Sequence, residues 1–158
     1  MGLRLAAITV ALVVSAGIAT AQHHGHHAPG DHGAPVDPRE LVAFPPALVE
    51  HTLANMRDHL LALQQISDAL AAGDTDQAGQ IAEQRLGMSS LRLHGAAEVA
   101  AFMPQGMQDA GTAMHKAASR FALEAQNAGV TGELKPALKA LGETMAACVG
   151  CHAGYRLR

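Results

Sequence analysis

Hydrophobic and small residues recur in alternating steps of three and four along much of this chain, a spacing that places them on one face of an α-helix. The first run follows Pro45 and Pro46 and ends near Gly73; its members are Val49, Leu53, Met56, Leu60, Leu63, Ser67 and Leu70. A weaker run, capped by Thr75 and ending near Gly87, contains Ala78, Ile81, Ala82 and Leu86. These runs predict one long and one short amphipathic helix.

The C-terminal half repeats the pattern twice. A helix that starts at Pro104 and ends near Gly129 would present Met107, Gly111, Met114, Ala118, Phe121, Ala125 and Ala128. A last helix, capped by Thr131, would present Leu134, Leu138, Leu141, Met145, Cys148, His152 and Tyr155. Residues 88–103 mix short apolar pieces with Ser and Gly and predict a connection with one helical turn. We therefore predict an all-α fold, an antiparallel four-helix bundle over residues 44–158.

Composition agrees with this fold class, because only 3% of the residues are aromatic and Trp is absent. The apolar residues are mainly Ala and Leu, which favour helix over sheet.

The first 43 residues lack the helical spacing. Arg4 precedes an apolar run over 5–18, and Ala19-Thr20-Ala21 has the form that signal peptidase cuts, so we expect residues 1–21 to be a cleaved signal peptide. The run is short for a bilayer, which makes an uncleaved anchor the weaker interpretation. Residues 22–43 are rich in His, Gly and Pro and predict a flexible tail. The mature chain would then reside in the periplasm.

The net charge of the chain limits the kinds of partner that it can bind. Arg4 is the only charged residue of the signal, so the mature chain keeps the other basic residues and all 14 acidic ones and has a formal charge of −4. No basic stripe is present, so we expect no nucleic-acid partner, and none in the membrane after cleavage. The sequence also lacks a catalytic triad, a paired-carboxylate site and a phosphate loop, and we do not expect an enzyme.

The only two cysteines belong to Cys148-Val149-Gly150-Cys151-His152, which matches the C-x-x-C-H signature of covalent haem attachment. On a helix, positions i, i+3 and i+4 share one face. Two thiols there can each add to a haem vinyl group, while the adjacent imidazole reaches the iron. A redox dithiol or half of a zinc site are the alternatives. The first belongs with a βαβ pattern, which is absent, and the second needs two further ligands from other elements.

The predicted signal, the four helices and the C-terminal segment CVGCHAGYR resemble the cytochrome c-prime family, the class II c-type cytochromes, over residues 44–158. The resemblance implies a helical bundle with one covalent haem c, an electron-transfer role with periplasmic redox partner proteins, and a basic residue near the haem, here Arg156, as a propionate contact. Many members form homodimers through the first two helices, but the short second helix here departs from that pattern.

The sixth iron position separates the two types of this family. The resemblance implies that six-coordinate members use a Met on the first helix, which matches Met56, and this would suit electron transfer. The alternatives are that Met56 is only a core residue, or that the iron is five-coordinate and binds NO or CO. We expect His51, His59, His94 and His115 to be partly exposed residues rather than ligands.

The tail contains five histidines close together, His23, His24, His26, His27 and His32. Imidazole suits Cu(II), Ni(II) and Zn(II), so a metal-binding tail coupled to a redox domain is a further hypothesis. After cleavage, His24 would be the third residue, which suits a square-planar site with the free amine, although an N-terminal Gln readily cyclises. A solvated low-complexity tail without metal is the alternative.

Overall fold

A computed structural model describes residues 36–157, and these residues are mostly helical. In chain order the elements are β1 (Glu40–Val42), α1 (Pro46–Ala71), α2 (Thr75–Arg85), the 3-10 turn η1 (Met88–Ser90), α3 (Ala96–Ala100), α4 (Gln105–Thr131), α5 (Leu134–Gly154) and β2 (Tyr155–Leu157). The all-α prediction is therefore confirmed. The tail histidines and the predicted signal peptide lie outside the described residues.

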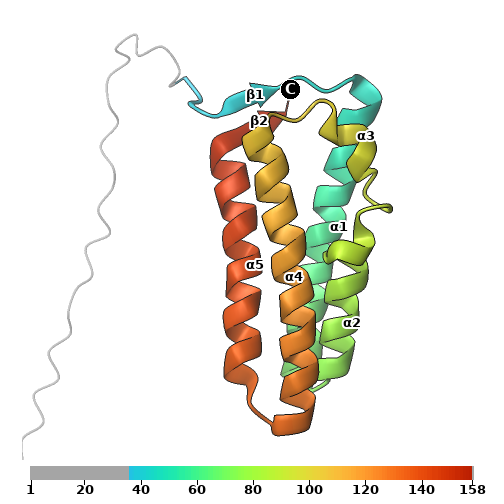
Figure 1. The fold of residues 1–158 in the computed structure, drawn as a ribbon, viewed down its shortest axis with the longest axis vertical. Coiled ribbons are helices and arrows are strands. Elements are labelled where there is room, and N and C mark those ends of the chain that lie inside the picture. Colours follow the sequence, from blue (N-terminus) through green and yellow to red (C-terminus); the bar gives the residue numbers. More distant parts are fainter. Residues whose placement is uncertain (1–35, 158) are drawn as a thin grey trace, which may run out of the picture. The chain divides into compact units, whose positions relative to one another are not determined.

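The four longer helices lie side by side and run alternately up and down (Figure 1). Helix α1 packs against α2, α2 against α4, and α4 against α5. The short α2 spans only part of this height, and η1 and α3 continue the same side toward the end that carries the strands. None of the helices within residues 36–157 is long and apolar enough to cross a membrane.

Several helix ends differ by a few residues from the sequence prediction. Asp74, rather than Thr75, caps α2, because its side chain accepts a hydrogen bond of 2.9 Å from the amide of Gln77. Helix α4 continues past Gly129 and ends at Thr131, and the next residue, Gly132, has a φ of 76° that suits a left-handed cap. Helix α5 begins at Leu134 without a side-chain cap.

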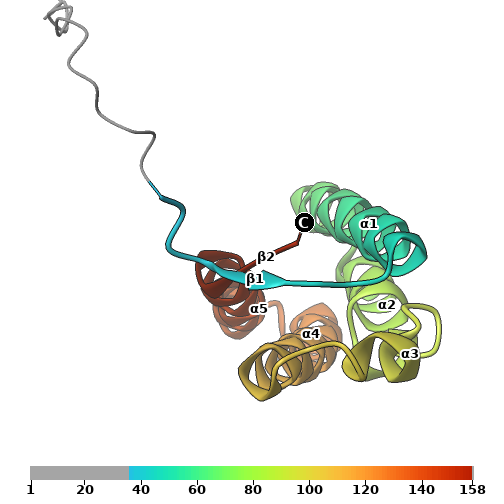
Figure 2. The same ribbon diagram turned by 90° about the horizontal axis from the view of Figure 1, so that it is seen from above.

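The two strands were not predicted. They pair in parallel, with Leu41 opposite Arg156, and cross one end of the helices, where β1 leads from the end of α5 toward the start of α1 (Figure 2). We refer to this as the strand end. Residues 40–42 belong to the segment predicted as a flexible tail, yet Val42 is buried. The pairing joins residues more than a hundred positions apart, which no local pattern shows.

Within residues 36–157, the core consists of two separate hydrophobic clusters. The larger cluster lies away from the strand end and centres on Phe121 and Ile66 with many alanines. The smaller cluster contains Val42, Phe44, Val99 and Met107. The predicted buried face of α4 is confirmed for most of its members, including Met107, Met114, Ala118, Phe121, Ala125 and Ala128.

The predicted core faces of α1 and α5 are partly wrong. In α1 the buried residues are Thr52, His59, Ala62 and Ile66, whereas Leu53 and Leu60 are exposed. In α5 the buried residues are Ala137, Ala140, Leu141 and Thr144, whereas Leu134, Leu138 and Met145 are exposed. Small side chains on the packed faces let the helices approach closely, so the larger leucines stand at the edges of the contact rather than in it.

Candidate functional site

A cavity of about 540 Å³ lies where the two hydrophobic clusters meet. Its walls come from α1, α4, α5, the connection between α2 and α4, and β2. Protein interiors are normally close-packed and contain few voids larger than a water molecule. A cavity of this size lies in the range of small-molecule and cofactor sites.

Both cysteines of the C-x-x-C-H motif line this cavity. They are free thiols on α5, three residues apart and each half-buried. Cys148 packs against the larger cluster and donates a hydrogen bond of 3.4 Å to the carbonyl of Thr144, while Cys151 packs against the smaller cluster. One thiol therefore lies beside each part of the core.

The environment of the thiols does not favour a redox dithiol. Burial raises the pKa of Cys148, and burial together with the neighbouring Cys148 raises the pKa of Cys151. Reactive cysteine pairs depend on a lowered thiol pKa. The raised values favour thiols that are held as neutral groups within the cavity wall.

The two residues predicted as iron ligands, His152 and Met56, line the same cavity from different helices. His152 lies in the last turn of α5 and is exposed, and Met56 lies on α1 and is half-buried. His152 was expected on a buried stripe of α5, and this expectation is wrong. The buried face of α5 is the one with Ala137 and Ala140. Met56 was predicted to face inward, and it does line the cavity.

Two buried polar atoms beside the cavity have no hydrogen-bond partner among residues 36–157. They are the hydroxyl of Thr52 and Nε of Arg156, and both residues line the cavity. Nε of Arg156 lies 3.5 Å from the carboxylate of Asp37, an ion-pair distance without hydrogen-bond geometry. That carboxylate is already engaged by Arg39, whose hydrogen bonds hold the pKa of Asp37 at about 2. The guanidinium groups of Arg39 and Arg156 thus share the single carboxylate of Asp37. One positive charge is left over, which suits an anionic ligand.

Three histidines that the sequence analysis placed partly in solvent are buried, so that expectation is wrong for them. His59, His94 and His115 are each at most 8% exposed and line the cavity. Nε2 of His59 lies 3.3 Å from Nε2 of His94, and the ring centre of His115 lies 5.4 Å from that of His94. His51, by contrast, is part-buried, as expected.

The surroundings of His59 and His94 favour the neutral imidazole. Burial, helped by His94 and His115, lowers the pKa of His59 from 6.5 to about 4, and burial also lowers the pKa of His94. No sequence motif predicts this cluster, because the three histidines come from separate elements: α1, the loop after η1, and α4. The burial of His59 could have been predicted from its spacing. It lies seven residues after Thr52 and three before Ala62, which places it on the small-residue face of α1.

Comparisons of the chain with protein-family models, with curated proteins and with solved structures give no match.

Proposed function

We propose that this chain is a periplasmic monohaem c-type cytochrome of the cytochrome c-prime type, an antiparallel four-helix bundle that transfers electrons. The haem would be bonded to Cys148 and Cys151, with His152 and Met56 as axial iron ligands. The observation that carries this proposal is that all four residues of the predicted site line one cavity between two hydrophobic clusters.

The residues of the cavity fit a haem in three respects. Two free thiols stand three residues apart on one helix face, as thioether bonds to two vinyl groups require. Apolar side chains from both clusters would exclude water from the macrocycle. Nε of Arg156 and the hydroxyl of Thr52 have no hydrogen-bond partner within residues 36–157, and both are donors suited to propionate oxygens.

When bound, a haem supplies one-electron oxidation and reduction of its iron, with a potential set by the axial ligands and by burial. His152 would supply a neutral imidazole and Met56 a thioether. Val149 and Gly150, which lie between the cysteines, are exposed, Val149 to 68%. A redox partner protein can therefore approach the chain directly beside the thiols.

The first test is covalent attachment. The purified mature protein should keep its haem in denaturant and show the spectrum of a haem with two thioether bonds. Cys148→Ser and Cys151→Ser should each lose one thioether bond, whereas Met145→Leu, a change at an exposed position of the same helix, should leave attachment unchanged. Absence of any covalent haem in protein produced by a host able to assemble c-type cytochromes would refute the proposal.

The second test concerns Met56 and separates electron transfer from ligand binding. In electron spin resonance and visible spectra, Met56→Ala should convert a low-spin iron to a high-spin one and open it to CO. Met107→Ala removes another methionine from the same cavity wall and serves as the matched control. A high-spin iron in the unaltered protein would favour the alternative, a five-coordinate cytochrome that binds NO or CO.

A further inference from the structure

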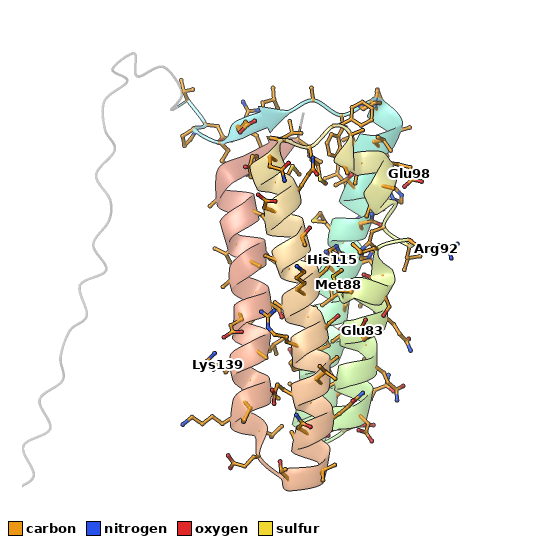
Figure 3. The ribbon with its side chains drawn as sticks, in the orientation of Figure 1. Glu83, Met88, Arg92, Glu98, His115 and Lys139 are labelled. Atoms are coloured by element: carbon orange, nitrogen blue, oxygen red, sulfur yellow. The ribbon has the colours of Figure 1, made fainter. Side chains whose placement is uncertain are left out.

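The buried histidines form a second constellation in the wall of the cavity, distinct from the cysteine motif. His59 comes from α1 and His94 from the loop before α3. His115 lies on α4 (Figure 3), where its ring reaches the carbonyl of Leu86 at the end of α2. His59 lies three residues beyond Met56 from the strand end, which is about 4.5 Å along the helix. His59 therefore lies farther from the strand end than Met56 does.

Hydrogen bonds assign the proton positions on two of the rings. Nδ1 of His115 lies 2.7 Å from the carbonyl oxygen of Leu86 and must donate to it. The hydroxyl of Ser90 donates to the carbonyl of Gly87, so it can only accept from Nδ1 of His94, 3.3 Å away. In its neutral form, each ring then carries the proton on Nδ1 and a lone pair on Nε2. This is the state of a histidine that ligates a metal through Nε2, with its other nitrogen oriented by a hydrogen bond.

The spacing of the first two rings fits one metal ion. Two Nε2 atoms that each lie about 2.0–2.1 Å from a zinc ion at a tetrahedral angle are about 3.3 Å apart. The Nε2 atoms of His59 and His94 are 3.3 Å apart. In the metal-free chain the same contact is a hydrogen bond from His59 to His94, and metal binding would move the proton of His59 from Nε2 to Nδ1.

We propose that His59 and His94 bind a divalent transition-metal ion of the zinc class, with His115 as the third ligand and water as the fourth. Residues 36–157 hold no three ligands already at bonding positions. His115, whose ring centre is 6.4 Å from that of His59, must therefore move inward when the ion binds. The carboxylate of Asp58 lies close enough to act on both His59 and His94 and favours a cation there. Arg85, which pairs with Asp58, offsets part of that charge.

The inference does not rest on the proposed haem, and its test can fail separately. The experiment uses the purified full-length mature protein with its native cofactor, in which the five tail histidines are changed to Ser so that the tail contributes no sites. After a chelator has removed loosely bound metal ions, Zn(II) is titrated into this protein by calorimetry. Co(II) absorption then reports whether the coordination is tetrahedral.

We expect one equivalent of Zn(II) and a tetrahedral Co(II) spectrum. His94→Gln and His59→Gln should each weaken Zn(II) binding by at least tenfold. His51→Gln is the matched control, because Nε2 of His51 already donates to the carbonyl of His94, 2.9 Å away, and is not free to ligate. Zinc should also raise the melting temperature of the parent and of His51→Gln, but not of the other two variants.

Three results would overturn the proposal. The first is no Zn(II) binding by the tail-substituted parent. The second is binding that survives both His59→Gln and His94→Gln, and the third is binding that disappears in Cys148→Ser instead, which would place the ion on the cysteines. Circular dichroism of each variant verifies folding, and His115→Gln tests the cluster again if either substitution unfolds the chain.

Discussion

Burial of His59 predicts a measurable loss of stability in mild acid. Its pKa is about 4 in the folded chain, against 6.5 for a free histidine, so between these values the unfolded chain binds more protons than the folded one. Stability must then fall as the pH falls through this window. For one group with these two pKa values, the free energy of unfolding drops by about 2 kcal/mol between pH 7 and pH 5. His94, whose pKa is also lowered, adds a loss of the same sign.

The assay is urea unfolding at pH 7 and pH 5, followed by far-UV circular dichroism with a chelator present, because bound metal would hold the imidazoles neutral. His59→Gln keeps an N–H donor beside His94 but cannot titrate. It should be less stable than the parent at pH 7, yet its stability should fall by about 2 kcal/mol less between the two pH values. If the parent and His59→Gln lose the same amount, His59 is not buried as a neutral group and the reasoning fails.

Two further predictions test the packing of α2 against α4 and against α1. A Cβ at Gly79 would lie 3.0 Å from the carbonyl oxygen of Ala122 on α4, whereas a Cβ at Gly142 meets nothing within 4 Å. Gly142→Ala should therefore stabilise the chain by about 0.5–1 kcal/mol, and Gly79→Ala should be about 1–3 kcal/mol worse than that in urea unfolding. Arg85 pairs with Asp58 and holds its pKa down, so Asp58→Asn should destabilise the α1–α2 contact by about 1 kcal/mol or less, and added salt should shrink the difference from the parent.

Helix positions and the site motif could be predicted from local sequence, because both depend on residues close together in the chain. The spacing of three and four indicated each long helix, and Pro46, Gly73 and Pro104 marked their ends to within a few residues. The cysteine pair is contiguous, so its shared helix face followed from helix geometry alone.

What could not be predicted depends on contacts between distant segments. The pairing of β1 with β2 brings Arg156 beside Asp37, and neither segment has a pattern that indicates it. The rotation of α1 was also missed, because its leucines suggest one face and its alanines another. Because the helices approach closely, the face of α1 with small residues such as Ala62 is the packed one. His59 lies on that face and is buried, whereas Leu60 is exposed.

The same rotation of α1 explains why polar and ionisable side chains line the cavity. Had the leucine stripe of α1 been its packed face, Leu53 and Leu60 would stand where Thr52 and His59 now stand, and the interior would be an ordinary apolar core. Packing α4 against α5 through small residues likewise leaves Cys148 and Cys151 at the edge of the contact, free to line the cavity. The thiols and the imidazoles therefore line one space that large side chains would otherwise fill. The two proposals thus assign chemically different ligands to one helical unit, one beside the cysteines and one between the histidines.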